Sequence, residues 1–115
     1  PRYVGIMDAL VHLSSREGLS RALPPALAAG KPVVAYDCDG AREVCFDGQT
    51  GLLVPPADLA ALKNRLLRLA GDAALREKLG RAGQNFVRDN FAVEKMVDAI
   101  YNLYLKLAAE CGIRL

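Results

Sequence analysis

Short apolar runs alternate along the chain with segments that favour helix. Two runs, at residues 9–13 and 32–36, are nearly continuous and end at polar residues, and a third, at 52–54, ends at two prolines. Continuous runs are typical of strands covered on both faces, as in a parallel sheet. The Ala/Leu-rich stretch 22–29 predicts a helix, with Gly30 as the left-handed residue that ends it. Strands alternating with helices predict an α/β fold with a parallel sheet.

The second half of the chain predicts mainly helices. Asp58 suits the N-cap of a helix that ends near Gly71, and Asp72 suits the N-cap of the next helix. The first of these helices carries an apolar stripe of leucines at 59, 62, 66 and 69. A turn with a short helix is expected at 40–46. A long final helix at 93–110 has a broad apolar face, which predicts a core stripe, although that face is wide for so small a sheet.

Composition bounds the size and the class of the protein. With 115 residues, 52% of them hydrophobic, the chain can form one modest core, so we expect a single folding unit over residues 1–115. Because the numbering begins at Pro1, we expect a piece of a longer protein. The net charge of +2 is spread along the chain, so nucleic acid is not an expected partner.

The cysteines and the lengths of the apolar runs indicate the cellular compartment in which the protein is expected. Three cysteines without a CxxC pair favour small buried side chains in a reducing compartment over disulfides or a zinc site. No apolar run approaches the roughly twenty residues that span a bilayer, and no N-terminal leader is evident. We therefore expect a cytoplasmic protein without a bound metal.

The loop at residues 14–21 is the first candidate site. It joins the first predicted strand to the first predicted helix, and in βαβ units ligands bind beyond the carboxyl ends of the strands. Loop N–H groups and a helix N-terminus there favour anions. Glycine at position 18 would let the backbone approach a ligand closely.

Each candidate residue also has a purely structural interpretation. Glu17 could pair with Arg16 or Arg21 on the surface. The stretch 40–43 could be a second phosphate-facing loop that begins at Gly40, or a tight turn with ordinary surface ion pairs. His12, in the middle of a strand, is expected to be a core or sheet-face residue and not a catalytic base.

Five stretches in this order resemble the group 1 nucleotide-sugar glycosyltransferases, which are retaining enzymes built from two Rossmann-like domains. The stretches are SSREGL at 14–19, ALAAGKPVVA at 26–35, GAREV at 40–44, DGQTGLLVPP at 47–56 and LGRAG at 79–83. The resemblance is to the second, donor-binding domain of this GT-B fold. It implies a Rossmann-like parallel sheet flanked by helices and a nucleoside diphosphate sugar as the donor, with no cofactor and no metal.

The resemblance assigns the site residues. Glu17 matches the first of two family glutamates and would contact the hydroxyls of the transferred sugar. Backbone N–H groups around Gly18, Leu19 and Ser20 would face the diphosphate, with the helix dipole adding about 0.5–2 kcal/mol. Arg21 is a further candidate phosphate clamp.

At Pro25 the sequence departs from the family pattern. The second family glutamate, which holds the ribose, falls at this position, and proline cannot bind a ribose hydroxyl. Because prolines fit only the first turn of a helix, Pro24 and Pro25 also predict that the regular helix begins near residue 23 or 24 and weaken the dipole contribution. A noncatalytic nucleotide-sugar-binding module and a nucleotide-sugar epimerase of the same fold are the alternatives.

The resemblance also implies what this chain lacks. The acceptor-binding domain and a basic pair that clamps the diphosphate would lie upstream of Pro1, so this chain alone is expected to be inactive. The final helix would pack on that first domain and would leave exposed apolar surface in its absence. Any membrane association would reside in the absent regions.

Overall fold

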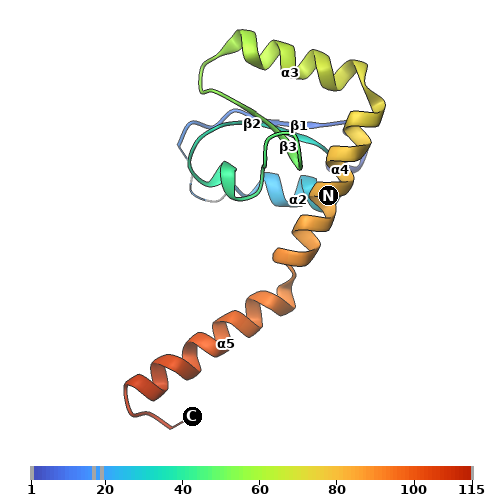
Figure 1. Ribbon diagram of the computed structural model, residues 1–115. Coiled ribbons are helices and arrows are strands. Elements are labelled where there is room, and N and C mark those ends of the chain that lie inside the picture. Colours follow the sequence, from blue (N-terminus) through green and yellow to red (C-terminus); the bar gives the residue numbers. More distant parts are fainter. Residues whose placement is uncertain (1, 17, 19, 115) are drawn as a thin grey trace.

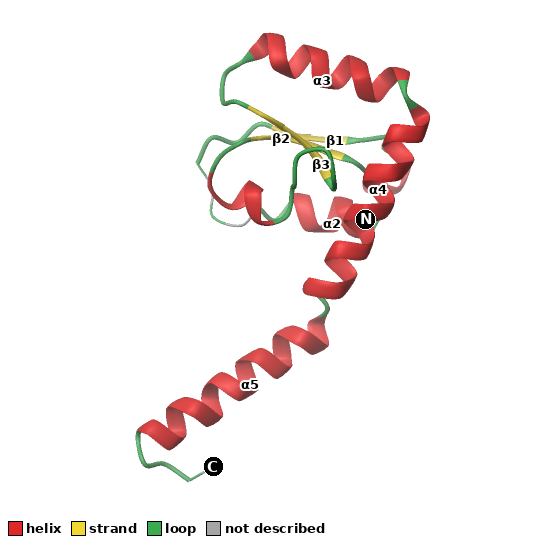
Figure 2. Cartoon of the chain, in the orientation of Figure 1, coloured by secondary structure: helices red, strands yellow, loops and turns green. Residues whose placement is uncertain are grey.

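A computed structural model describes residues 2–16, 18 and 20–114 of the chain. Its elements are the helices α1 (Arg2–Ile6), α2 (Leu23–Ala28), α3 (Leu59–Gly71), α4 (Ala73–Asn90) and α5 (Val93–Glu110), the strands β1 (Leu10–His12), β2 (Val33–Tyr36) and β3 (Gly51–Val54), and a 3₁₀ helix η1 (Asp39–Glu43). The three strands are all parallel and lie in the order β1-β2-β3. This arrangement confirms the α/β fold with a parallel sheet flanked by helices (Figure 1, Figure 2).

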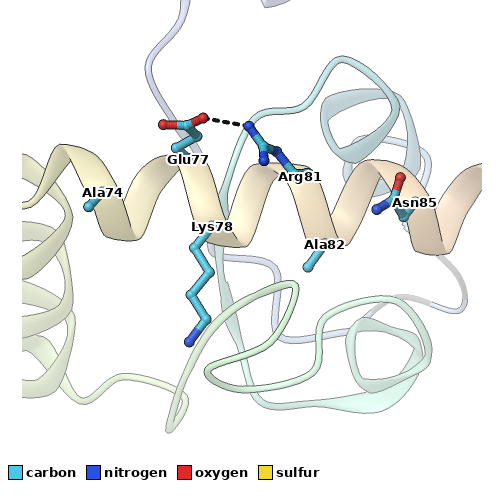
Figure 3. A pocket seen from close by; sticks show the side chains of 6 residues that line it. All are labelled: Ala74, Glu77, Lys78, Arg81, Ala82 and Asn85. Atoms are coloured by element: carbon cyan, nitrogen blue, oxygen red, sulfur yellow. Dashed lines mark hydrogen bonds and ion pairs between the residues drawn. The ribbon is translucent and has the colours of Figure 1, made fainter.

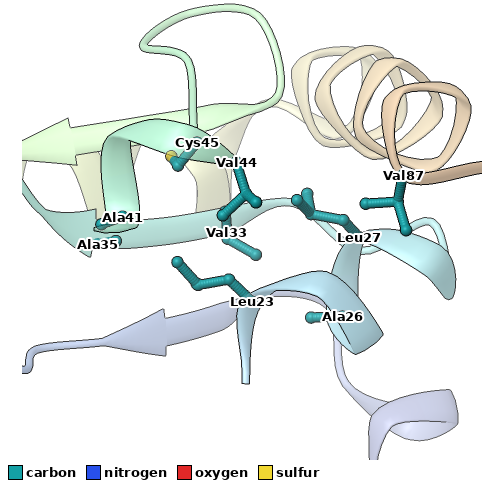
Figure 4. Packing of buried hydrophobic residues seen from close by; sticks show 9 residues of the cluster. All are labelled: Leu23, Ala26, Leu27, Val33, Ala35, Ala41, Val44, Cys45 and Val87. Atoms are coloured by element: carbon teal, nitrogen blue, oxygen red, sulfur yellow. The ribbon is translucent and has the colours of Figure 1, made fainter. Parts of the chain in front are cut away.

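Strand β2 is buried on both faces, as its continuous apolar run predicts. The same expectation is wrong for β1, which lies at the edge of the sheet with Val11 exposed. Alternate residues of β2 face opposite ways, so that Val33 packs in one buried cluster and Val34 in the other. The first cluster joins β2 to α2, η1 and the end of α4 and comprises Leu23, Ala26, Leu27, Val33, Ala35, Ala41, Val44, Cys45 and Val87 (Figure 4). The second lies under α3 and comprises Val34, Leu52, Val54, Leu62, Leu69 and Leu79.

Local signals set the ends of the helices. The Asp58 carboxylate accepts the N–H of Ala61 at 3.0 Å, and that of Asp72 accepts the N–H of Leu75 at 2.9 Å. Both are side-chain N-caps, as predicted. Helix α2 begins at Leu23, which confirms the start expected from the prolines.

Helix α2 ends in a Schellman motif. Gly30 has φ +74° and donates its N–H to Leu27 O at 2.9 Å, while the next N–H, of Lys31, reaches Ala26 O at 3.0 Å. The positive φ explains why glycine occupies this position. The turn sends the chain directly into Pro32 and the buried strand β2.

Helix α4 crosses the end of α2 at very short range. A Cβ atom added at Gly80 would lie only 2.0 Å from the carbonyl oxygen of Gly30, and one added at Gly83 would lie 2.4 Å from Leu27 Cδ2. Gln84 beside them donates its Nε2 to Ala28 O at 3.1 Å. The two glycines of the LGRAG stretch therefore hold α2 against α4 and fix the element that follows the candidate loop.

Helix α5 spans the residues expected from the sequence but leaves the body of the molecule, whose longest dimension is 59 Å (Figure 1). None of its described side chains is buried, so the expectation that its face forms a core stripe is wrong. The exposed apolar surface expected in the absence of a first domain is confirmed. Tyr101 and Tyr104 on it are 61% and 64% exposed.

Other expectations about burial also need correction. Cys45 is buried as expected, but Cys38 is only half-buried. Cys111 is exposed because α5, which it follows, has no buried residue and no neighbouring element among the described residues. Leu59 on the predicted α3 stripe is exposed, since the helix begins beyond the edge of the core. No helix in the described part of the chain is long and apolar enough to span a bilayer.

Candidate functional site

Two loops meet beyond the carboxyl ends of β1 and β2. The first follows His12, and the second leaves Tyr36 and enters η1. They are tied together because the Cys38 thiol donates to the carbonyl oxygen of Ser14 at 3.1 Å. Side chains and backbone from both loops line one small pocket, namely His12, Ser14, Gly18, Ser20, Cys38 and Ala41.

The pocket between the two loops is too small for a sugar or a phosphate. Its volume is about 10 Å³, which is the least space in which one water molecule fits. A ligand the size of a sugar or a phosphate therefore does not fit between the described residues that line this pocket.

Ser20 has an internal role in the first loop. The residue is buried, and its hydroxyl oxygen accepts the N–H of Ala22 at 3.2 Å. The same hydroxyl lies 3.2 Å from Nε2 of His12, at the end of β1. Both hydrogen bonds join the loop to its own flanking elements.

Open space lies over Gly18. Apart from its two chain neighbours, a Cβ atom added there would find no protein atom within 4 Å, and the φ of Gly18 lies outside the left-handed region. Neither packing nor backbone conformation therefore requires a glycine at this position. The absence of a side chain leaves the loop backbone accessible from outside.

Helix α2 offers few N–H groups to an anion. It is six residues long, its N-cap Ala22 has no side-chain cap, and Pro24 and Pro25 in its first turn carry no N–H. The N–H of Ala22 is already bonded to Ser20. An anion at this site would depend chiefly on the N–H groups of the loop itself.

The second loop carries an ion pair that anchors it. Arg42 Nε contacts Asp37 Oδ1, so the arginine is held next to the end of β2. Gly40 and Ala41 are buried, while Arg42 and Glu43 are exposed. The surface ion pairing considered for this stretch is present at Arg42, with Asp37 as its partner.

The predicted site residues do not all fall within the structure. Glu17 and Leu19 lie outside the described residues. Gly18 and Ser20 line the pocket, whereas Arg21 and Pro25 are exposed and are not among its lining residues. Pro25 lies on the outer side of α2, away from its buried positions Leu23, Ala26 and Leu27.

Two residues that line the pocket, His12 and Cys38, were not predicted as site residues, whereas Ser14 belongs to the candidate loop 14–21. His12, Ser14 and Cys38 line the pocket together. Their common signal is position, because each lies at or just beyond the carboxyl end of a predicted strand. The bonds they make join residues 8 and 24 positions apart, which a local pattern does not reveal.

Other polar or reactive groups lie elsewhere and lack the features of a site. Burial, with Asp47 and Asp37 nearby, raises the pKa of the Cys45 thiol to about 12, so this thiol is no nucleophile near neutral pH. No group of three His, Cys, Asp or Glu side chains in the described part of the chain could hold a metal.

A surface hollow on α4 is formed by a single helix face. Its lining residues are Ala74, Glu77, Lys78, Arg81, Ala82 and Asn85 (Figure 3). Glu77 and Arg81 form an ion pair of 2.6 Å one turn apart. Such a pair is typical of a solvated helix face, and no second element encloses a ligand here.

Comparison with known proteins decides the family. Residues 1–86 match the family model described as glycosyl transferases group 1. The chain belongs to the group 1 glycosyl transferases. Its parallel sheet and flanking helices are those of GT-B glycosyltransferases, and the match is to their C-terminal domain.

Individual group 1 and related proteins show how much of the fold this chain covers. It is 46% identical over 72 residues to a phosphatidyl-myo-inositol mannosyltransferase of Mycobacterium leprae, covering 63% of this chain and 19% of the relative. A sucrose-phosphate synthase of Thermosynechococcus elongatus is 32% identical with a TM-score of 0.89, covering 94% of this chain and 27% of that one. The HepE protein of Anabaena, solved with UDP, is 24% identical with a TM-score of 0.88, covering 91% of this chain and 29% of that one. This group 1 chain thus spans less than a third of each of these proteins.

Proposed function

We propose that this chain is the sugar-donor-binding part of a group 1 glycosyltransferase that moves a sugar from a nucleoside diphosphate to an acceptor hydroxyl with retention. The observation that carries the proposal is the meeting of two loops beyond the carboxyl ends of β1 and β2. In open α/β sheets this edge is where ligands bind. The HepE likeness supports a nucleotide as ligand, since that protein of the same fold holds UDP.

The open backbone at Gly18 supports a diphosphate at the first loop. Loop N–H groups next to an accessible glycine can approach phosphate oxygens closely. Glu17 would bind hydroxyls of the transferred sugar, and N–H groups of Gly18, Leu19 and Ser20 would bind the diphosphate. Exposed Arg21 would add a positive charge beside it.

The chemistry proposed for the site is stabilisation of a leaving group. When the bond from the sugar to the diphosphate breaks, negative charge develops on the phosphate oxygens. Preorganised N–H groups and a nearby guanidinium stabilise that charge more than they stabilise the bound substrate, which lowers the barrier. Glu17 would orient the sugar, and neither a cofactor nor a metal enters this scheme.

Pro25 favours a second candidate, a noncatalytic nucleotide-sugar-binding module. The exposed position on α2 has no carboxylate for the ribose. Since no buried contact depends on this side chain, Pro25→Glu is compatible with the fold. If the missing carboxylate limits binding, Pro25→Glu should tighten UDP binding at least about ten-fold, in line with one charge-assisted hydrogen bond.

The bare face of α5 supports a partner domain in the same protein. Helix α5 has apolar side chains along one face and no buried residue, and an amphipathic helix gains most of its stability when another surface packs on that face. We propose that the acceptor-binding domain covers it, in a cytoplasmic protein. Transfer would then take place between this chain and that domain.

A pair of glycine variants tests whether the loop at Gly18 binds the nucleotide. Gly18→Ala and Gly71→Ala both place a methyl group where no protein atom lies within 4 Å. Only Gly18→Ala lies in the proposed site, so it should weaken binding of UDP or GDP at least ten-fold while Gly71→Ala leaves it unchanged. Equal affinities for both variants would refute the site.

Activity needs the complete protein that contains this chain. With UDP-glucose or GDP-mannose and acceptor, release of UDP or GDP should fall at least a hundred-fold in Glu17→Ala and stay unchanged in Glu77→Ala, a surface control on α4. The anomeric configuration of the product, measured by NMR, decides on retention. A wild-type protein that binds the nucleotide and transfers nothing would favour the binding module.

A further inference from the structure

Side-chain hydrogen bonds tie the candidate loop to its flanking elements. Between described residues, no backbone N–H within 14–21 donates to a backbone carbonyl. The contacts of this segment include those of Ser20 with His12 and Ala22, and that of Cys38 with Ser14. The loop geometry therefore depends in part on these polar contacts.

His12 is the rigid end of this chain of contacts. It is the last residue of β1 and lies opposite Ala35 of the buried strand β2 in the parallel register. Its Nε2 lies 3.2 Å from the Ser20 hydroxyl, which in turn accepts the N–H of Ala22, the N-cap of α2. The buried Ser20 hydroxyl thereby connects the end of β1 to the residue at which the loop enters α2.

The chemistry of the hydroxyl makes the link specific. A serine hydroxyl has one proton and two lone pairs, so it can accept the Ala22 N–H and still bond Nε2 in either tautomer of the imidazole. Because Ser20 is buried, loss of the His12 contact would leave the hydroxyl with an unmet bond in a site shielded from water. The cost falls on the loop, since β1 is hydrogen-bonded to β2.

The prolines make this link necessary. In most helices the first-turn N–H groups help to fix the entry of the chain, but Pro24 and Pro25 have none. The Ser20 hydroxyl is the partner that the structure provides for the N–H of Ala22. The anchoring to His12 thus substitutes for a side-chain cap on α2.

From these contacts we propose that His12 is a positioning residue for the sugar-donor site, acting through Ser20 to hold the loop that binds the diphosphate. The inference rests on the proposed function for its ligand and on the structure for its contacts. His12 does not act on the substrate itself, because the pocket it lines, of about 10 Å³, admits neither a sugar nor a phosphate.

Amide exchange of the 115-residue chain tests the link without any ligand. His12→Leu and Ser20→Ala should each speed exchange of the Ala22 amide about five-fold, the factor that one hydrogen bond supplies. His12→Gln, whose amide can reach the same hydroxyl, should stay within two-fold of wild type. Val11→Ala, at the exposed neighbouring position of β1, is the control for general loosening of the strand.

The double variant and nucleotide binding complete the test. His12→Leu combined with Ser20→Ala should exchange at Ala22 no faster than Ser20→Ala alone, and His12→Leu should weaken UDP or GDP binding about five-fold, with rescue by His12→Gln. An unchanged Ala22 amide in His12→Leu, or weaker binding in His12→Gln as well, would overturn the proposal. A wild-type chain that binds neither nucleotide would instead refute the proposed function, and the exchange data would still decide the role of His12.

Discussion

Replacing Gly80 by alanine tests how closely α4 approaches α2. On an ordinary helix this change would add about 1 kcal/mol of stability, because alanine is the better helix former. Here the new Cβ would lie 2.0 Å from Gly30 O and 2.9 Å from Gly30 C, both backbone atoms that cannot rotate away. Relief requires a shift of more than about 1 Å, and overpacking of this kind costs about 1–3 kcal/mol or more.

Because both clashing atoms belong to the backbone, the cost of Gly80→Ala falls at the upper end of this range, about 3 kcal/mol, and subtracting the helix-propensity gain leaves a loss of about 2 kcal/mol in the free energy of unfolding. Urea unfolding followed by circular dichroism measures it. Gly71→Ala, with no protein atom within 4 Å of the new methyl, is the matched control and should be neutral or slightly stabilising. If Gly80→Ala were as stable as Gly71→Ala, the close packing of α4 on the Schellman turn would be refuted.

Four further predictions concern single side chains. The pKa of the Cys45 thiol is raised to about 12 from 9.0, because its buried environment favours the neutral form. The neutral thiol therefore stabilises the fold fully below pH 9, and this contribution is lost as pH rises from 9 to about 12, where the thiol of the unfolded chain ionises. Wild type should lose about 4 kcal/mol relative to Cys45→Ala across that interval, measured by urea unfolding at each pH, and a constant difference would contradict it. In the native chain at pH 7.5, iodoacetamide should modify exposed Cys111 and spare Cys45, as read by mass spectrometry of peptides. Asp58→Ala should cost about 1 kcal/mol through loss of its N-cap bond to Ala61, whereas Tyr104→Ser on bare α5 should change the stability by less than about 0.5 kcal/mol.

Features set by local chemistry could be predicted from the sequence. Asp58 and Asp72 cap their helices through bonds three residues long, and Gly30 and Gly112 take positive φ where helices end. Pro24 and Pro25 restrict the backbone within one turn, which is why the start of α2 was predictable. Each of these signals acts over a few residues, so a linear pattern contains it.

Features that depend on distant partners could not be predicted in the same way. The apolar face of α5 has the same periodicity whether it is buried or bare, and only the absence of a neighbour leaves Tyr101 exposed. Exposed Cys111 follows from the same cause. The short helix α1 was not predicted, since its five residues have no buried side chain and no cap signal.

The candidate site also combines features that local sequence signals predict with contacts between distant residues that they do not predict. Its place at the carboxyl ends of the strands follows from the order of the elements, and its glycine at 18 is visible in the sequence. The contacts of His12 with Ser20 and of Cys38 with Ser14 arise only when the loops close over the sheet. His12 and Cys38 could therefore be assigned to the site only from the folded structure.

The most direct test of the central claim is a residue-resolved NMR titration of the isotope-labelled 115-residue chain with UDP and with GDP at millimolar concentration. The account predicts saturable amide shifts confined to residues 14–22 and to η1, with the helix face of Glu77 and Arg81 unaffected. Saturable shifts centred on that helix face or on α5, with none at 14–22, would contradict it.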